Sequence, residues 1–268
     1  MSKFSKLGKA IAAIIKQPSL LNNVLNDAKV NKAEVINKHN LPKGLSSVSI
    51  TELLGNVNET VAPYCCIDGG SIPMDFVLLK GLAKKFTDCN YFEIGTWRGE
   101  SAANVASVAK HVTTLNLPDA EMLSMGLDKK YVDLHRFFSK AIPNVTHLQG
   151  NSHTFDFTPH RKKYDLVFVD GDHHYESVKS DTANAFSLLK DEHSIIVWHD
   201  YGNNPTDIRW DVLKGILDGT PAEKRKNIYR VSNTLCAIYT TLPLDIYQQE
   251  AFQTPAIDFQ MQISSKKI

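Results

Sequence analysis

The most informative stretch of this sequence is Tyr164–Tyr201, YDLVFVDGDHHYESVKSDTANAFSLLKDEHSIIVWHDY. Two short apolar runs within it, Leu166–Val169 and Ile195–Trp198, are rich in β-branched and aromatic residues, which is typical of buried parallel strands. Between the runs, apolar residues recur at helical spacing, and parallel strands require such a crossover helix. These residues are Val178, Ala185, Leu188 and Leu189. The stretch therefore predicts a β-α-β unit of an α/β protein.

Both predicted strands end in acids and imidazoles. These are Asp170, Asp172, His173 and His174 after the first strand, and His199, Asp200 and Tyr201 after the second. In an open α/β sheet, ligands bind outside the carboxyl ends of the strands, so the two groups should face one crevice. We expect the chemistry of the protein at this edge of the sheet.

Length and composition bound the architecture. The chain has 268 residues, of which 43% are hydrophobic, and this favours one large α/β domain with an N-terminal extension. The formal net charge of +1 gives no indication of nucleic acid binding. The cysteines contain no CxxC pair, so we expect small buried side chains in a reducing compartment. They are Cys65, Cys66, Cys89 and Cys236.

Membrane-spanning and secretory signals are absent from the sequence. No run approaches the ~18 consecutive apolar residues of a membrane span. The apolar run Ile11–Ile15 is too short for the core of a signal peptide, and Lys16 ends it. We expect a cytoplasmic protein without a transmembrane segment.

Residues 2–16 predict a basic amphipathic helix, with apolar side chains on one face and lysines off it. The apolar residues are Phe4, Leu7, Ile11, Ile14 and Ile15, and the lysines are Lys3, Lys6, Lys9 and Lys16. Such a helix suits an anionic membrane surface. It also suits docking onto the body of the protein or onto a second copy, which would make a homo-oligomer. Of the two we favour docking.

The remaining elements follow from periodicity and turn residues. We expect helices over residues 74–86, 101–109, 119–140 and 208–217, and further strands over residues 91–95, 111–117 and 145–149. The pairs 228–231 and 235–239 predict an antiparallel hairpin. Residues 19–62 show only weak helical patterns near 20–25 and 50–54, and residues 242–268 show no clear pattern. The predicted organisation is an extension over 1–62, a domain over 63–241 and a tail over 242–268.

An acidic glycine turn, Glu93-Ile-Gly95-Thr-Trp-Arg-Gly99, joins the strand at 91–95 to the next helix. Gly95 permits a close backbone approach, Gly99 lets the turn close against the helix, and unpaired N–H groups there suit an electronegative ligand. The spacing is GxxxG after an acid, which differs from the GxGxxG of dinucleotide binders. Alone, two glycines in a turn are a weak signal.

Five β-α units closed by a hairpin, with this turn after the first strand, resemble the class I S-adenosylmethionine-dependent methyltransferases over about Gly69–Thr240. VDGDHHY at 169–175 and WHDY at 198–201 are similar to the DGDHxY and HD strand ends of small-molecule O-methyltransferases of methyltransferase family 24. The resemblance implies a Rossmann-like fold with a mostly parallel seven-stranded sheet, an antiparallel C-terminal hairpin and helices on both faces. It also implies methyl transfer from S-adenosylmethionine to a hydroxyl of a small or glycosyl acceptor.

The resemblance places the cofactor over the glycine turn. The implied cofactor-binding residues are Glu93, Gly95, Thr96, Trp97, Gly99, Ser101, Asn116, Asn151, Ser152 and Asp170. Asn116 stands where the family usually has an acid that binds the ribose; an amide also donates and accepts hydrogen bonds, and Asp119 is the alternative. A polar turn explains Asn151 and Ser152 equally well.

The two strand-end acids and their neighbours suit a metal and a base. Carboxylate oxygens are ligands that Mg²⁺ selects, and by the resemblance Asp170, His199 and Asp200 hold Mg²⁺ or Mn²⁺, with His199 suiting a softer ion than Mg²⁺. Acids that only cap turns are the alternative. His173 lies at the offset where similar sugar methyltransferases have a general base, and an imidazole with a pKa near ~6.5 suits that role. His174 competes for it.

Two rival functions remain open. A metal-dependent nucleotide-sugar glycosyltransferase would use Asp170-Gly171-Asp172 as its metal motif but would leave residues 93–99 unexplained. A non-catalytic module that binds the cofactor is the second rival. We expect Trp97, Tyr175 and Trp198 to pack within the protein rather than to stack on a substrate.

Overall fold

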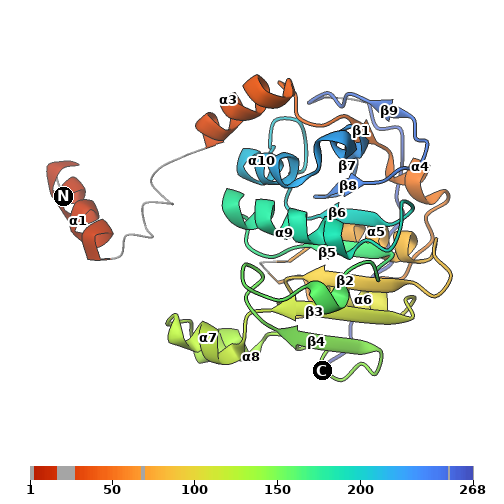
Figure 1. Ribbon diagram of the computed structural model, residues 1–268, viewed down its shortest axis with the longest axis horizontal. Helices are drawn as coiled ribbons and strands as arrows, with labels where there is room; N and C mark the ends of the chain where they lie inside the picture. The colour runs from red at the N-terminus through yellow and green to blue at the C-terminus, as the bar shows by residue number, and fades with distance from the viewer. Residues whose placement is uncertain (1–2, 17–27, 68–69, 253, 268) are drawn as a thin grey trace.

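A nine-stranded sheet forms the centre of the computed structural model, which describes residues 3–16, 28–67, 70–252 and 254–267 (Figure 1). The strands are β1 Ser47–Val48, β2 Asn90–Ile94, β3 His111–Asn116, β4 Val145–Gln149, β5 Leu166–Val169, β6 Ile195–Trp198, β7 Ile228–Val231, β8 Ala237–Tyr239 and β9 Ile246–Tyr247. Their order is β4-β3-β2-β5-β6-β8-β7-β1-β9. Strands β2 to β6 run parallel, while β8 runs antiparallel to both β6 and β7. The expected Rossmann-like α/β fold is confirmed, but the sheet has nine strands instead of seven.

The two additional strands come from opposite ends of the chain. β1 pairs in parallel with β7, where Ser47 lies opposite Arg230, and β9 pairs antiparallel with β1, where Ser47 lies opposite Tyr247. Strands of two residues are too short to show an alternating pattern, which is why the sequence does not reveal them. The sheet therefore includes residues outside the range 63–241.

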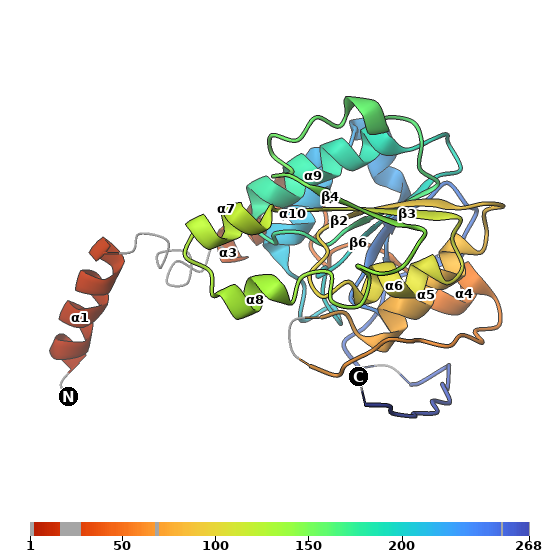
Figure 2. The same cartoon turned by 90° about the horizontal axis from the view of Figure 1, so that it is seen from below.

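Helices lie on both faces of the sheet. The α-helices of the described residues are α1 Lys3–Lys16, which stands apart from the sheet, α3 Ala28–His39, α4 Ile50–Leu54, α5 Pro73–Ala83, α6 Glu100–Ala106, α7 Asp119–Ser124, α8 Lys129–Asp133, α9 Tyr175–Leu188 and α10 Trp210–Gly219. Short 3-10 helices span η2 Thr158–His160 and η3 Ala222–Asn227. Figure 2 shows α9 and α10 on one side of the sheet and α4, α5 and α6 on the other. Helix α3 packs on the outer side of α10.

β5 shows why these strands are apolar throughout. Val167 and Val169 belong to the hydrophobic core that includes residues of α9 and α10. Leu166 and Phe168 belong to the core on the α5 and α6 side, and all four residues are buried. A strand covered on both faces has no solvent side, so it lacks polar alternation.

The predicted helix over 119–140 is wrong in two respects, because it is interrupted and because its second part ends at Asp133. α7 and α8 are separate short helices, and Gly126 between them has φ +85, a left-handed conformation that ends a helix. The weak pattern at 50–54 corresponds to α4, whereas the pattern at 20–25 lies outside the described residues.

Two expectations about composition can also be compared with the structure. Cys89 and Cys236 are buried, but Cys65 is only partly buried and Cys66 is exposed, so the expectation of four buried cysteines is wrong for two of them. Within the described part of the chain, none of the helices combines the length and the apolar character needed to cross a membrane.

Candidate active site

The carboxyl ends of β5 and β6 bring Asp170, His173, His199 and Asp200 together. Val169 pairs with Trp198 across these strands, so the residues that follow lie side by side. His199 Nδ1 lies 3.1 Å from Asp170 Oδ1 and 3.3 Å from Asp200 Oδ2. Asp170, His173 and Asp200 each offer one possible metal-ligating atom, and these three atoms lie within 4.8 Å of one another. Four of the seven strand-end side chains expected to face one crevice thus form one cluster. The other three lie outside it: Asp172 pairs with His174, and the buried Tyr201 hydroxyl accepts a hydrogen bond from the Leu45 N–H.

His199 is buried among three carboxylates. Its Nε2 lies 3.2 Å from Asp75 Oδ2. Its Nδ1 faces Asp170 and Asp200 but makes no hydrogen bond of good geometry with any described residue. Burial alone would lower the pKa of His199, but the neighbouring carboxylates raise it well above its ordinary value of 6.5. The position therefore favours a positive charge, which a proton on Nδ1 or a metal ion can supply.

Asp75 is the member of this cluster that sequence reasoning missed. It lies in the first turn of α5, is fully buried, and accepts hydrogen bonds from the backbone N–H groups of Ile72 at 2.8 Å and Leu235 at 2.9 Å. A histidine that binds a metal through one ring nitrogen usually donates a hydrogen bond from the other to a carboxylate such as this one, and that bond fixes the ring. In the sequence, an acid just after Pro73 indicates only the start of a helix. Its contact with His199 spans 124 residues of chain.

The adjacent histidines have different surroundings. His173 Nδ1 lies 3.1 Å from Asp200 Oδ2. His174 Nδ1 lies 2.6 Å from Asp172 Oδ1, and the other oxygen of Asp172 accepts a hydrogen bond from Ser177 Oγ at 2.7 Å. The two imidazoles therefore engage different carboxylates. His173 faces the acid cluster, while His174 belongs to the polar start of α9.

Asp200 remains ionised in this cluster. Burial would raise the pKa of its carboxyl, but His199, His173 and Arg209 outweigh burial and lower the pKa to about 2. Its backbone has φ +57, a left-handed conformation that aspartate tolerates better than most residues. Asp200 is therefore a permanent negative charge between the two imidazoles.

The glycine turn after β2 packs directly against the end of β5. A Cβ at Gly95, where φ is +94, would lie 1.9 Å from the carbonyl oxygen of Asp170. A Cβ at Gly99, where φ is +79, would lie 2.1 Å from Ser139 Oγ. Glycine is thus required at both positions by contacts within the protein. The Gly95 contact places the turn beside Asp170.

Glu93 lies fully buried beneath this turn. Tyr91 donates a hydrogen bond to Glu93 Oε2 at 2.6 Å. Burial raises the pKa of Glu93 to about 8, although hydrogen bonds from Tyr91 and Ser101 partly oppose it. Nearby, Thr96 Oγ1 and Trp97 Nε1 are buried and find no hydrogen-bond partner in the described parts of the chain. These polar atoms fit a ligand with polar groups over the turn.

Other predicted cofactor contacts are engaged within the protein. Asn116 Oδ1 accepts a hydrogen bond from the Thr96 N–H at 3.4 Å, and its Nδ2 donates to the Leu117 carbonyl at 3.2 Å. Asn116 therefore holds the turn. Asp119, the alternative ribose ligand, forms hydrogen bonds of 2.5 and 2.7 Å with Arg136.

The turn after β4 also has structural partners. Asn151 donates to Glu121 Oε1 at 3.4 Å and accepts from the His153 N–H at 3.0 Å. The Ser152 hydroxyl hydrogen-bonds to Asp181. Trp97 packs as expected, with its ring centroid 4.5 Å from that of Tyr131.

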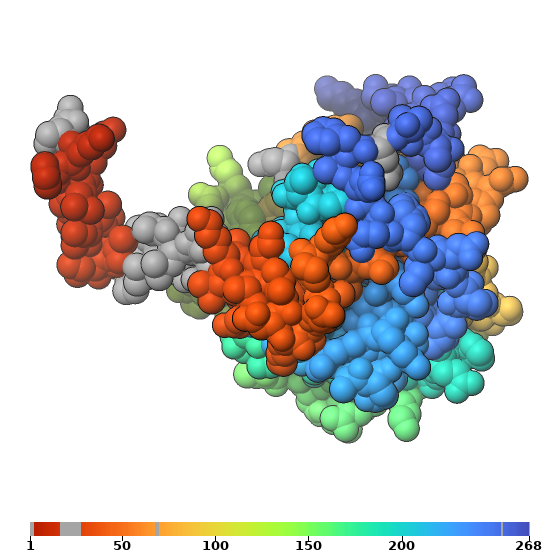
Figure 3. All heavy atoms as spheres, turned by 90° about the horizontal axis from the view of Figure 1, so that it is seen from above, coloured from red at the N-terminus to blue at the C-terminus, as the bar shows by residue number. Residues whose placement is uncertain are grey.

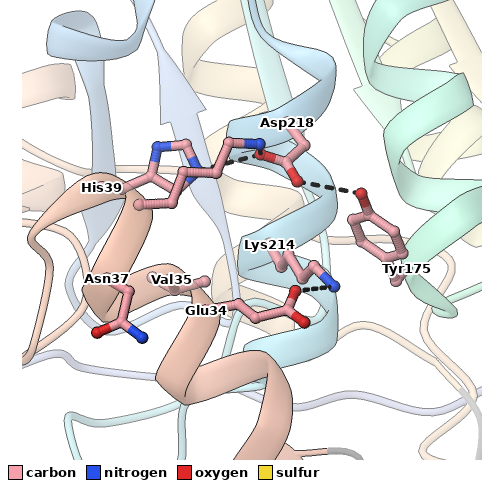
Figure 4. A pocket seen from close by; sticks show the side chains of 8 residues that line it. Glu34, Val35, Asn37, His39, Tyr175, Lys214 and Asp218 are labelled. Carbon is pink, nitrogen blue, oxygen red and sulfur yellow. Dashed lines mark hydrogen bonds and ion pairs between the residues drawn. The ribbon is translucent and has the colours of Figure 1, made fainter.

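A cavity of about 400 Å³ lies between α3, α9 and α10 (Figure 4). Tyr175, the first residue of α9, donates to Asp218 Oδ2 at 3.0 Å. Lys38 and His39 of α3 lie 2.6 and 3.0 Å from the other oxygen of Asp218. Lys214 Nζ lies 4.0 Å from the centre of the Tyr175 ring. This network ties the start of α9, which directly follows His173 and His174, to α3 and α10.

Comparison with known proteins gives one family match. Residues 92–201 match the model of a family described as a methyltransferase domain. The matched range runs from β2 to just after β6, so it contains the glycine turn, Asp170, His173, His199 and Asp200. A search of curated proteins finds no match.

Solved structures show limited likeness. A Staphylococcus aureus protein provisionally named a caffeoyl-CoA O-methyltransferase is 18% identical, with a TM-score of 0.44, over 79% of this chain and 99% of that one. CalS11, a TDP-rhamnose 3'-O-methyltransferase of calicheamicin biosynthesis, is 13% identical, with a TM-score of 0.40, over 63% and 78%. A Bacillus halodurans protein provisionally named a methyltransferase is 17% identical, with a TM-score of 0.34, over 47% and 50%, so the chain spans half of its length. The similarity to a methyltransferase domain therefore rests on the family match over residues 92–201.

Proposed function

We propose that the protein is an S-adenosylmethionine-dependent methyltransferase that methylates a hydroxyl of a small or glycosyl acceptor with the help of a divalent metal ion. The observation that carries this proposal is the cluster of Asp170, His173 and Asp200, with donor atoms within 4.8 Å. It adjoins the glycine turn because Gly95 packs on the Asp170 carbonyl. The family match to a methyltransferase domain over the same residues supports it.

The cofactor would supply the methyl group on a sulfonium. The proposed cofactor-binding residues are Glu93, Gly95, Thr96, Trp97, Gly99, Ser101, Asn116, Asn151, Ser152 and Asp170. The buried, unpaired polar atoms of Thr96 and Trp97 support the part of this set at the turn. The protein would align acceptor and donor and exclude water, which accounts for much of the rate in reactions of this kind.

His173 is our candidate for the general base. A hydroxyl becomes a nucleophile as it loses its proton, and an imidazole at the cluster can accept that proton. The ionised Asp200, 3.1 Å from His173 Nδ1, would hold the ring and leave Nε2 facing the acceptor. Asp200 would be a positioning residue for His173 as well as a metal ligand.

Asp170, His199 and Asp200 are our candidates for the metal ligands. The His199 Nδ1 atom faces both carboxylates without a good hydrogen bond, and Asp75 holds the opposite nitrogen. Two carboxylates with an imidazole suit Mn²⁺ better than Mg²⁺. His173 is also close enough to be a ligand, so its two roles need separate tests.

The first test is ligand binding by calorimetry. S-adenosylhomocysteine should bind, and a UDP-sugar should not; the reverse result would favour a glycosyltransferase. Chelation should slow methyl transfer to a hydroxyl acceptor, and added Mn²⁺ should restore it.

His173→Ala tests the base. It should lower the rate by about 10²–10⁴-fold, the usual range for a positioned base. Mn²⁺ affinity should stay unchanged if His173 is the base and fall if it is a ligand. His174→Ala is the matched control and should be much milder. Full activity of His173→Ala together with indifference to chelator would refute both assignments.

A further inference from the structure

Helix α1 exposes a continuous apolar face. Phe4, Leu7, Ile11 and Ile15 are 86%, 57%, 50% and 74% exposed, and none of the residues Lys3–Lys16 is buried. Spacings of three and four residues place these side chains in one stripe along the helix. In Figures 1 and 3, α1 stands away from the body of the protein. Exposure of these apolar side chains to water is unfavourable, and no described residue of the protein buries them.

The rest of the helix surface is cationic. The range 3–16 contains four lysines and no acid. At 100° per residue, Lys6, Lys9 and Lys16 fall on the side opposite the apolar stripe, and Lys3 lies beside the stripe. An apolar face with a lysine-rich opposite side is the pattern of helices that lie in the interfacial plane of anionic membranes.

A second copy of the helix would cover the apolar stripe but would not neutralise the lysines. In two α1 helices packed through their stripes, Lys6, Lys9 and Lys16 would lie on the outer sides, and residues 3–16 supply no acid to pair with them. Anionic headgroups complement both features of α1 at once.

A second apolar surface lies on the side from which α1 extends. Figures 1 and 2 show α7 and α8 on this side. Their region exposes Leu123, Met125, Leu127, Tyr131, Leu134 and Phe137 to 39–65%. α7 follows β3, so this surface lies at the carboxyl edge of the sheet, where the candidate active site also lies. A flat partner that meets α1 can also meet this surface.

We propose that α1 binds the surface of an anionic lipid membrane, with its apolar stripe in the interface and its lysines toward the headgroups. The association brings the α7–α8 side of the molecule to the membrane. The inference does not depend on the proposed methyltransferase activity.

The test is sedimentation of the full chain with phosphatidylcholine vesicles that contain phosphatidylserine, against vesicles of phosphatidylcholine alone. Binding should require phosphatidylserine and weaken with salt. Lys6→Ala should weaken it about fivefold, the effect expected of one lysine near an anionic surface.

A matched pair of variants tests the face. Ile11→Asp and Ala13→Asp add the same charge to the same helix, on the apolar stripe and on the polar side respectively. Ile11→Asp should weaken vesicle binding at least about tenfold more than Ala13→Asp, because it places an ion in the apolar interface. Both variants should keep the parent's melting temperature, since α1 buries no residue.

Three outcomes would overturn the proposal. They are equal binding to both kinds of vesicle, equal losses in the two aspartate variants, and a fall in molar mass by light scattering in Ile11→Asp alone. The last result would assign the stripe to a second copy of the chain.

Discussion

Replacing Glu93 with glutamine should stabilise the protein above neutral pH and weaken cofactor binding. Glu93 is fully buried beneath the glycine turn, and burial raises its pKa from an ordinary 4.5 to about 8. At neutral pH the folded protein therefore keeps a proton on Glu93 that the unfolded chain releases. A neutral amide of the same shape would remove this difference.

The sign and the size follow from linkage. Between the unfolded pKa of 4.5 and the folded pKa of about 8, the folded state binds more protons than the unfolded state, so stability falls as pH rises. Each pH unit in this window lowers the free energy of unfolding by about 1.4 kcal/mol. The total loss is roughly 3–5 kcal/mol. Below this pH window Glu93→Gln and the parent should have nearly the same free energy of unfolding. Above the window the variant should be the more stable protein.

Urea denaturation between about pH 5 and about pH 9 measures this difference. Glu192→Gln is the control, because the Glu192 side chain is 83% exposed and the substitution should leave the pH dependence of the parent unchanged. Calorimetry of the same proteins should show that Glu93→Gln binds S-adenosylhomocysteine roughly 2- to 10-fold more weakly, the loss expected for one ordinary hydrogen bond.

The stability argument is refuted if Glu93→Gln is less stable than the parent at high pH, or if both proteins lose stability with the same slope. Unchanged affinity for S-adenosylhomocysteine, with the stability result as expected, would instead remove Glu93 from the cofactor site.

Two further substitutions test the packing around the site. Gly95→Ala should destabilise the protein by roughly 3–5 kcal/mol, because its Cβ would lie 1.9 Å from the Asp170 carbonyl oxygen in a left-handed backbone. Gly126→Ala, also at positive φ but with no atom within 4 Å, should cost only about 1–2 kcal/mol; equal urea midpoints would contradict the packing argument. Tyr175→Phe removes the hydrogen bond to Asp218 and should cost about 0.5–1.5 kcal/mol. No change in that variant would mean that the bond does not hold the start of α9.

Sequence reasoning located best the strands that are buried on both faces. Leu166–Val169 and Ile195–Trp198 have the same bounds in the sequence prediction and in the structure. Continuous apolar runs of this kind leave little choice of conformation or position. The strands β1 and β9 depend entirely on pairing partners that are distant in the chain, so no local pattern marks them.

The candidate site also contains residues that the sequence indicates and one that it does not. Asp170, His199 and Asp200 were identifiable because the ends of neighbouring parallel strands must meet at one edge. Asp75 was not, since its contact with His199 joins a helix start and a strand end 124 residues apart. At Gly95 the sequence predicts a close backbone approach, and the structure shows one to the backbone of Asp170; the approach of a cofactor there stays a prediction.

The short strands β1 and β9 also determine how the chain tolerates truncation. β7 pairs with β8 on one side and with β1 on the other. A protein cut to residues 63–241 would lose both short strands and leave one side of β7 with unpaired N–H and C=O groups. Such an edge is a template for pairing with another molecule. Residues far from the candidate active site would then govern whether the shortened protein stays dispersed or aggregates edge to edge.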